Sequence, residues 1–401
     1  MFRFPMRNGM LLGMLAVLST VAPPADAQQA ATSRSAAAAR VAPKDSIRIR
    51  LQSLLDSLRQ SAAFPGATLA VALPDAEVIA VAAGFSDTTR KTAMRTSDKL
   101  LQGSVGKTYV AAVAMQLVGE GKLDLDAPIS RYLGDEPWFS RLPNARHITV
   151  RQLMNHTSGL VRYEFQPAAA AALRATPFRE WTPVDRLTLI FDTAAPFAAG
   201  EGWEYSDTNY IVLGMIIERL TRQPYYTELR RRILQPLALR NTIPSDRPEL
   251  PGLVVGYAGA GNELGGYDAS MEGGRLRINP QFEWTGGGIA STTADLARWA
   301  KLLYEGKAFP SELLPRMLDG VPAKLGPNTR YGLGVILRET RLGPIYGHSG
   351  FFPGYATEML YVPSLRTAAA IQVNVTAPYP RGLVAALVRA VELSTADQRA
   401  P

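Results

Sequence analysis

The chain has 401 residues, with 43 Lys and Arg, 35 Asp and Glu, three His and no Cys, and its formal net charge is +8. The absence of Cys excludes disulfides, zinc ribbons, iron–sulfur clusters and a cysteine nucleophile, and three scattered His are too few for a His-rich site, so we predict no metal and no cofactor. The basic residues are spread along the chain, and the run Arg230-Arg231-Arg232 is typical of a solvated helix face, so we expect no nucleic-acid partner.

The first 27 residues predict an export signal. Arg3 and Arg7 precede an uncharged stretch over 9–22, and Ala25-Asp26-Ala27 offers the small residues that a signal peptidase reads. The apolar stretch is shorter than the ~20 residues of a membrane span. We therefore predict a signal peptide over 1–27, a periplasmic or secreted location and no membrane span after cleavage, with an uncleaved anchor as the alternative. The Ala-, Ser- and Gln-rich residues 28–43 predict a flexible leader.

The next elements are a helix, a hairpin and a second helix. Apolar residues recur at helical spacing over 47–58. The β-prone runs 67–73 and 77–83 meet at Pro74-Asp75, as in a hairpin. Residues 104–120 predict a helix with a buried side.

The rest of the chain predicts a helical middle followed by strands. The pattern from 124 to about 279 is mostly helical, and another helix is expected over 293–304. Then come strands over 331–337, 343–346, 356–361 and 367–375 and a closing helix over 381–393. Because no helices separate these strands, we predict an α+β fold: an antiparallel sheet flanked by helices, with a large, mainly helical insertion. The domain is expected over 44–395, with a sheet subdomain of about 44–115 and 284–395 and a helical subdomain of about 116–283.

Ser104 and Lys107 form a Ser-x-x-Lys pair at the start of a predicted helix. Residues three apart lie on one helix face, so the Lys107 amine can reach the Ser104 hydroxyl. The positive end of the helix dipole favours alkoxide character at Ser104, and the same field with desolvation is expected to push Lys107 towards a neutral base. Alone, such a pair is more often incidental on a helix surface.

The same segment offers a second interpretation, because Gly106-Lys107-Thr108 resembles the end of a phosphate-binding P-loop. The first Gly of that motif would stand at position 101, which is Leu101. The run 99–102 is also too short for the buried strand that precedes such a loop. We therefore set the nucleotide-binding hypothesis aside.

Tyr205 begins a second element, Tyr205-Ser206-Asp207-Thr208-Asn209-Tyr210, before an apolar run. A phenol and an amine near one hydroxyl can share a proton relay, because the charged form of one lowers the pKa of the other. The alternative is a plain helix start, in which Ser206 or Asp207 caps the helix and Tyr205 packs.

The third element is Tyr346-Gly347-His348-Ser349-Gly350-Phe351, where a predicted strand follows a turn. Acyl hydrolysis needs two donors aimed at the developing oxyanion, and a strand edge near Gly350 can offer a backbone N–H. His348 can hydrogen-bond the tyrosine of the second element or a substrate carboxylate, although a lone His is more often structural.

In this order, the three elements resemble the serine β-lactamase-like family, in the branch that holds class C β-lactamases, D,D-carboxypeptidases, D-aminopeptidases and esterases. The similarity extends from about residue 45 to 393. It includes LVGEGKLDLD at 117–126, ITVRQLMNHTSGL at 148–160, WEYSDTNYIVLGMIIERL at 203–220 and ILQPLAL at 233–239.

The resemblance implies a role for each site residue. Ser104 would be the acylated nucleophile, Lys107 its proton acceptor, and Tyr205 the general base and acid. The backbone N–H groups of Ser104 and Phe351 would form the oxyanion hole. The expected substrate-binding residues are Asp207, His348, Ser349 and Gly350.

Two further segments are set aside. His156-Thr157-Ser158-Gly159 holds both a Ser and a His, but it precedes Tyr205 and lacks a Gly two residues after the His, so we interpret it as a structural turn. Asp192-Thr193-Ala194 is similar to the aspartic-protease motif Asp-Thr-Gly but lacks the Gly and a second copy.

Two positions depart from the family's pattern. Asp207 replaces the usual Asn, and a carboxylate cannot donate to the acyl carbonyl of a substrate. It would instead attract Lys107, raise the pKa of the lysine and slow acylation, unless desolvation keeps Asp207 neutral. His348 stands where many relatives have Lys, and a mostly neutral imidazole anchors a carboxylate more weakly. Both features favour a peptidase or esterase over an efficient β-lactamase.

We therefore predict an exported serine hydrolase that forms an acyl-enzyme on Ser104, with D,D-carboxypeptidase or D-amino-acid peptidase activity as the leading hypothesis. The partner is a small-molecule or peptide substrate, with cell-wall peptides among the candidates. A β-lactamase or carboxylesterase is the alternative within the family. A catalytically silent peptidoglycan-peptide binding protein is the alternative from another class, disfavoured because binding needs none of Ser104, Lys107 and Tyr205. The sequence does not indicate an oligomeric state.

Overall fold

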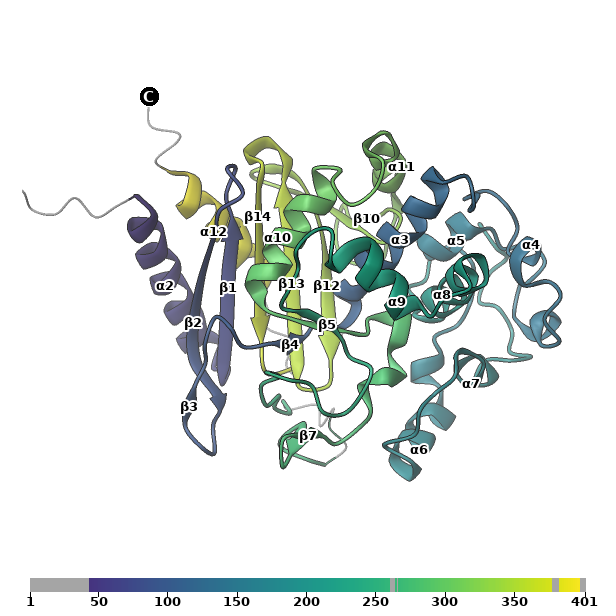
Figure 1. Cartoon of the computed structure of the whole chain (residues 1–401), viewed down its shortest axis with the longest axis horizontal. Coiled ribbons are helices and arrows are strands. Elements are labelled where there is room, and N and C mark those ends of the chain that lie inside the picture. Colours follow the sequence, from purple (N-terminus) through teal and green to yellow (C-terminus); the bar gives the residue numbers. More distant parts are fainter. Residues whose placement is uncertain (1–42, 260–263, 265, 377–381, 397–401) are drawn as a thin grey trace, which may run out of the picture. The chain divides into compact units, whose positions relative to one another are not determined.

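The structure is a computed structural model that describes residues 43–259, 264, 266–376 and 382–396. The predicted signal peptide, and the leader up to residue 42, lie outside these residues. The main strands are β1 (Gly66–Ala72), β2 (Val78–Asp87), β3 (Thr92–Ala93), β9 (Val321–Pro322), β10 (Arg330–Tyr331), β11 (Ile336–Thr340), β12 (Gly343–Phe352), β13 (Tyr355–Val362) and β14 (Thr367–Val373). They form one nine-stranded antiparallel sheet in the order β3-β2-β1-β14-β13-β12-β11-β10-β9 (Figure 1).

Helices cover both faces of this sheet, and strand alternation decides which residue meets which helix. In β1, Leu69 and Val71 pack with the helices from the two ends of the chain, α2 (Pro43–Ala62) and α12 (Leu383–Thr395). The alternate residues, Ala70 and Ala72, face the larger core, where α10 (Thr293–Tyr304) packs. The sheet is thus built from both chain ends, as predicted.

The remaining helices lie beyond β12, on the side of the molecule away from α2 (Figure 1). They are α3 (Lys107–Gly119), α4 (Ser130–Leu133), α5 (Val150–Met154), α6 (Pro167–Ala175), α7 (Pro183–Thr188), α8 (Thr208–Thr221), α9 (Tyr225–Leu229) and α11 (Leu314–Leu318). Helices α3 and α8 are buried on nearly every side, which explains why their sequences are apolar all round. In the described ranges, no helix has both the length and the apolar character of a membrane span.

The expectation of helix up to about residue 279 is wrong for its last part. Between 235 and 279 the described residues form no helix, but contain β5 (Thr242–Pro244) and the small hairpin of β6 (Met271–Glu272) and β7 (Arg275–Leu276). β5 pairs with β8 (Ile289–Ser291), which also pairs with β4 (Leu100–Leu101). Pro248, Pro251 and several glycines in this stretch oppose helix formation.

The strand expected over 331–337 is two strands. A turn separates β10 from β11, in which Gly332 N donates to Val335 O at 2.8 Å and Gly334 has a φ of +77°. The strand expected over 343–346 is longer, because β12 continues to Phe352. The helix over 293–304, the hairpin at Pro74-Asp75 and the α+β class are confirmed.

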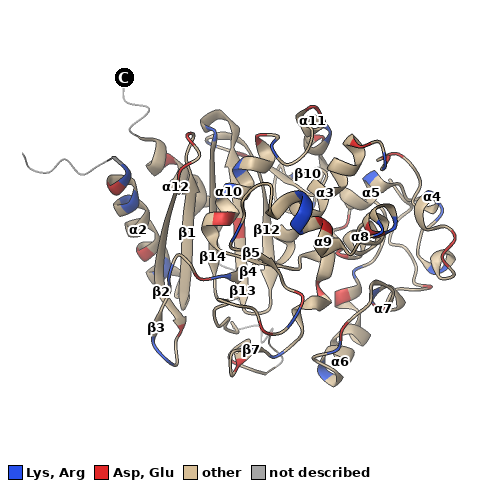
Figure 2. Ribbon diagram, viewed as in Figure 1, with Lys and Arg blue, Asp and Glu red and all other residues tan. Residues whose placement is uncertain are grey.

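The arginine run is only in part the solvated face that the sequence suggested: the side chains of Arg230 and Arg231 are 43% and 60% exposed, whereas Arg232 is buried. Charges of both signs are distributed over the helices and loops (Figure 2). Arg231 and Arg232, in a π-helical segment after α9, both pair with Glu228. Arg232 also pairs with Glu120, and its side chain is only 8% exposed.

Candidate active site

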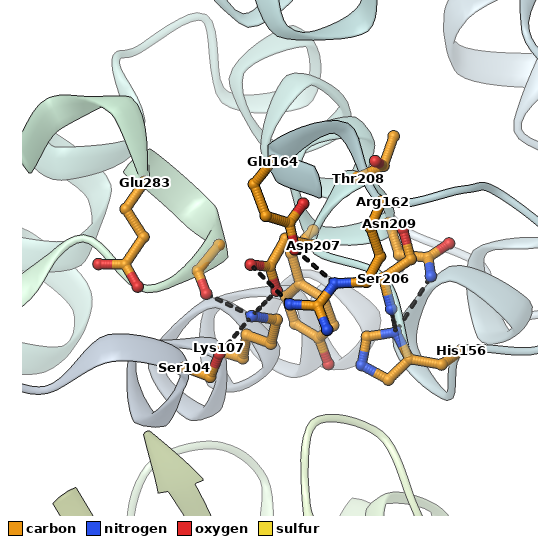
Figure 3. A network of polar contacts seen from close by, with 12 residues as sticks. Ser104, Lys107, His156, Arg162, Glu164, Ser206, Asp207, Thr208, Asn209 and Glu283 are labelled. Atoms are coloured by element: carbon orange, nitrogen blue, oxygen red, sulfur yellow. Dashed lines mark hydrogen bonds and ion pairs between the residues drawn. The ribbon is translucent and has the colours of Figure 1, made fainter. Parts of the chain in front are cut away.

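Ser104 lies in a short 3₁₀ segment, η1 (Gly103–Gly106), directly before α3. Lys107 is the first residue of α3 and is fully buried. Its Nζ donates a hydrogen bond to Ser104 Oγ at 3.0 Å (Figure 3). The approach expected for residues three apart at a helix start is therefore present.

The backbone of η1 packs directly against strand β12. Pairing with β11 stops halfway along β12, which leaves one edge of its second half open to η1. A Cβ on Gly103 would lie only 2.5 Å from the backbone N of Phe351, and a Cβ on Gly350 would overlap the carbonyl O of Gln102. This close approach packs η1, which holds Ser104, against the backbone of Phe351. The oxyanion hole made by the amides of Ser104 and Phe351 stays a prediction.

Gly106, the second glycine of the P-loop-like segment, serves packing. A Cβ at this position would overlap the carbonyl O of Gly287. The preceding strand, β4, has only two residues. The segment therefore lacks the long buried strand and the free glycine loop of a phosphate cradle.

Lys107 sits among oxygen atoms of three elements. Besides Ser104, its ammonium contacts the carbonyl O of Gly286 and forms an ion pair with Asp207 (Figure 3). Burial lowers the pKa of Lys107, but the Asp207 carboxylate and then Tyr205 raise it by more, so that its pKa lies above the ordinary value. The expectation that Asp207 attracts Lys107 and raises its pKa is confirmed, and the expectation of a neutral Lys107 is wrong for the resting protein.

Asp207 is held as an ionised group. Arg162 Nη2 lies 4.0 Å from Asp207 Oδ2, on the side away from Lys107. Burial raises the pKa of Asp207, but the charges of Lys107 and Arg162 lower it below its usual value. Desolvation does not keep this group neutral. Asp207 is the N-cap residue of α8, but its side chain makes no capping hydrogen bond, which argues against the plain helix-start interpretation.

Tyr205 stands beside Lys107, with the Nζ atom 4.9 Å from its ring centroid. Its hydroxyl oxygen is buried and has no hydrogen-bond partner among the described residues. Burial raises the pKa of Tyr205, and the Lys107 ammonium offsets only part of this rise. At neutral pH the Tyr205 side chain is therefore a neutral phenol. Its hydroxyl can donate a proton directly, but it can accept a proton only after it has lost its own.

His348 lies near the site but is not available as a carboxylate anchor. Its Nε2 lies 2.8 Å from Tyr331 Oη, and its Nδ1 lies 2.6 Å from the carbonyl O of Ser349. The carbonyl can only accept, so Nδ1 carries the proton and the Tyr331 hydroxyl donates to Nε2. Burial, followed by the charge of Lys107, lowers the pKa of His348 to about 3. In this geometry the His348 ring is neutral and both of its nitrogens are occupied, and its role in substrate binding stays a prediction.

Ser349 also departs from its expected role. Strand alternation sends its side chain to the face of the sheet opposite His348. There Ser349 Oγ accepts a hydrogen bond from Arg338 Nη2 at 2.9 Å, and Arg338 forms an ion pair with Glu358 at 3.0 Å. The resemblance alone assigned this serine to substrate binding, and motif order does not say which face of the strand a side chain occupies.

The structure adds charged residues to the site that sequence reasoning missed. Arg162 Nε pairs with Glu164 Oε1 at 2.6 Å, next to Asp207 (Figure 3). Burial and then the charge of Asp207 raise the pKa of Glu164 to about 8, although Arg162 opposes the shift. Burial likewise raises the pKa of Glu283 to about 8, with Lys107 opposing. Arg162 and Glu164 follow the HTSGL stretch and Glu283 directly precedes Trp284, and none of the three belongs to a recognisable motif, so no sequence signal marked them.

The other segments singled out in the sequence lie in different settings. Asp192 forms an exposed ion pair with Arg141 at 2.7 Å. His156 is fully buried in a turn and has a φ of +64°. Within the described part of the chain, His, Asp and Glu form no group of three or more that could hold a metal ion.

The fold and this site define a class of protein. An antiparallel sheet flanked by helices, with a serine and a buried lysine one helical turn apart at a strand edge, is the arrangement of a serine hydrolase. The protein is a serine hydrolase.

Residues 51–393 match the family model described as Beta-lactamase, and the chain belongs to this family. It is 25% identical over 345 residues to penicillin-binding protein 4* of Bacillus subtilis, covering 81% of this chain and 71% of the relative. It is 26% identical over 326 residues to the D-aminopeptidase of Brucella anthropi, covering 81% of this chain and 59% of the relative. The solved structure of D-amino acid amidase from Ochrobactrum anthropi is 26% identical, with a TM-score of 0.75 over 88% of this chain and 99% of that chain.

The ion pair between Lys107 and Asp207 generates a first prediction. In Asp207→Asn the pKa of Lys107 is expected to fall, because the carboxylate that stabilises the ammonium is gone. A larger fraction of Lys107 is then neutral at pH 7, so kcat/KM for amides and β-lactams should rise by about tenfold for each unit of the pKa change. The acid limb of the pH–rate profile should move to lower pH. Asp192→Asn, which breaks an exposed pair, is the control, and an unshifted limb with unchanged or lower kcat/KM in Asp207→Asn would contradict the prediction.

The buried His348 generates a prediction on stability. Its pKa is about 3 in the folded protein and near 6.5 when unfolded, so below pH 6.5 the unfolded chain binds more protons. The contribution of His348 is present above pH 6.5 and is lost as the pH falls towards 3, at a rate of at most about 1.4 kcal/mol per pH unit. In His348→Gln, the free energy of unfolding in urea should fall less steeply between pH 6.5 and 4. The exposed His147 provides the control His147→Gln, which should keep the wild-type slope; parallel curves for all three proteins would refute the argument.

Proposed function

We propose that the protein is an exported hydrolase that cleaves amide bonds of D-amino-acid peptides and amides through an acyl-enzyme on Ser104. The observation that carries the proposal is the 3.0 Å contact between Ser104 Oγ and Lys107 Nζ, beside Tyr205. Similarity to a D-aminopeptidase and to a D-amino acid amidase supports the substrate class. Export is supported by the pattern of residues 1–27.

In acylation, Ser104 Oγ bonds to the substrate carbonyl carbon and its proton passes to Lys107. Lys107 must first release one proton to solvent, because it rests as an ammonium. The charge that develops on the carbonyl oxygen is stabilised by the backbone N–H groups of Ser104 and Phe351. Tyr205 gives its proton to the leaving amine as the C–N bond breaks, and it recovers a proton from Lys107.

In deacylation, water attacks the carbonyl carbon of the acyl-enzyme. Tyr205 relays the proton of the water to the neutral Lys107, and Lys107 returns a proton to Ser104 Oγ as the ester C–O bond breaks. The resting state is restored when Lys107 is again an ammonium paired with Asp207.

The charges around Ser104 favour a neutral leaving group. A carboxypeptidase substrate or a β-lactam brings a free carboxylate, which needs a cation or several donors. His348 is neutral, Lys107 and Arg162 share the ionised Asp207, and Arg338 is paired with Glu358 on the opposite face of the sheet. Moving a carboxylate from water into this site costs free energy, and a leaving group that has no carboxylate avoids this cost. We therefore propose amide or aminopeptidase substrates ahead of the D,D-carboxypeptidase activity.

The enzyme class is tested by covalent labelling with a fluorescent fluorophosphonate. The wild-type protein is expected to label with 1:1 stoichiometry, and Ser104→Ala is expected to lose the label while folding normally. Ser364→Ala removes an exposed serine and should label as the wild type does. A wild-type chain that never labels, or equal labelling of Ser104→Ala, would favour a silent binding protein.

The substrate class is tested with two peptides that differ only at the carboxyl end, D-alanyl-D-alaninamide and D-alanyl-D-alanine. We expect kcat/KM to be at least about tenfold higher for the amide, a difference of 1.4 kcal/mol, because its leaving group carries no charge to desolvate. The L,L-peptide amide is the stereochemical control. Equal rates for the two D,D-peptides, or turnover of nitrocefin faster than that of the amide, would reject the proposed preference.

A further inference from the structure

His156 belongs to the HTSGL segment, which the catalytic scheme leaves without a task. Its ring is fully buried and lies against that of Tyr205, with the centroids 4.2 Å apart and the planes 37° apart. On another side, Tyr331 packs edge-on at 4.7 Å. The Tyr205 ring is therefore packed against His156.

His156 also holds the backbone on both sides of Tyr205. The amide N–H of Glu204 donates to the carbonyl O of His156 at 3.1 Å. The amide N–H of Ser206 donates to His156 Nδ1 at 3.3 Å (Figure 3). The residues before and after Tyr205 are thus both bound to the same histidine.

A second contact links His156 to the start of α8. Asn209 Oδ1 accepts a hydrogen bond from Ser158 Oγ at 2.5 Å, so the amide group of Asn209 is oriented with its Nδ2 towards His156 Nδ1, at 3.0 Å. Since both Ser206 N and Asn209 Nδ2 are donors, Nδ1 accepts and Nε2 carries the proton. Burial keeps the pKa of His156 well below its ordinary value, so the ring remains neutral and Nδ1 remains an acceptor over the working pH range.

The backbone of His156 has a conformation that non-glycine residues rarely adopt. Its φ of +64° lies in the left-handed region, which His tolerates better than most residues but still at a cost of about 1 kcal/mol or more. Such a conformation persists where the surroundings fix it, here through the bonds to Glu204 and Ser206. The turn thereby aims the imidazole at the Tyr205 segment.

We propose that His156 is a positioning residue for Tyr205: through Nδ1 and its ring face it fixes the phenol hydroxyl in reach of Ser104 and of the leaving group. The inference rests on the proposed role of Tyr205 as proton donor. The ring and hydrogen-bond contacts of His156 with the described residues do not include Ser104. Its loss should therefore affect those steps that need a proton from Tyr205.

The test compares two leaving groups. The anilide of D-alanine p-nitroanilide needs a proton to leave, whereas the p-nitrophenolate of p-nitrophenyl butyrate does not. For both substrates kcat/KM reports steps only up to acylation. A fluorophosphonate titration counts the reactive Ser104 sites in each preparation. The rates are expressed per reactive site, so misfolded protein does not affect them.

His156→Phe keeps a flat ring against Tyr205 but removes the acceptor for Ser206 and Asn209. We expect kcat/KM for the anilide to fall about 10²-fold, as for a displaced catalytic group, and kcat/KM for the ester to change less than about threefold. His156→Asn places an acceptor oxygen near the position of Nδ1 and tolerates a positive φ, so it should recover at least part of the anilide rate. His147→Asn, at an exposed histidine, should match the wild type.

Hydrogen exchange gives a readout that does not depend on turnover. The Ser206 amide should lose protection in His156→Phe and regain it in His156→Asn. Equal losses of anilide and ester rates in His156→Phe, or a Ser206 amide as protected as in the wild type, would overturn the inference while leaving the proposed function intact. A wild-type chain that labels at Ser104 but has no anilidase activity would instead refute the proposed amide substrate, and the exchange result would still decide whether His156 holds the Tyr205 segment.

Discussion

The close approach of the Gln102–Gly106 backbone to strand β12 is the constraint on which the site depends. Gly103 and Gly350 leave no room for a Cβ between the two segments, and Gly106 leaves none beside Gly287. A side chain at any of these positions would push the segments apart, because backbone atoms cannot move aside as a flexible side chain can. The placement of the Ser104 segment against strand β12 therefore depends on the absence of side chains at these glycines.

That packing also removes water from Lys107 and so dictates the charges around it. A buried ammonium is stable only with an ionised partner, which Asp207 supplies, and Arg162 completes the balance on the other side of the carboxylate. Burial penalises a further negative charge in the same space, and the Asp207 carboxylate adds to that cost, which is why Glu164 and Glu283 have pKa values of about 8. In the resting site the carboxyl groups of Glu164 and Glu283 are therefore mostly protonated at neutral pH, and Lys107 is an ammonium.

The two buried histidines serve as neutral hydrogen-bonding groups in this arrangement. His348 accepts from Tyr331, and Tyr331 packs against His156, whose ring in turn lies against Tyr205. A continuous aromatic cluster thus connects strand β12 with the turn before α8. Its contacts fix where the phenol of Tyr205 lies relative to Lys107, although Tyr205 makes no hydrogen bond of its own among the described residues.

The sequence by itself determined the features that arise within a few residues of chain or from repeated patterns. The contact between Ser104 and Lys107 follows from helical periodicity, and the helix over 293–304 and the hairpin at Pro74-Asp75 follow from local spacing and turn chemistry. Asp207 as the partner of Lys107 was also foreseen, because the two groups attract whatever the details of the fold.

Only the tertiary structure decided the protonation of Lys107, the two occupied nitrogens of His348, the face on which Ser349 lies and the presence of Glu164 and Glu283. Those properties depend on burial and on neighbours that come from distant parts of the chain, and neither is encoded in the spacing of residues along it.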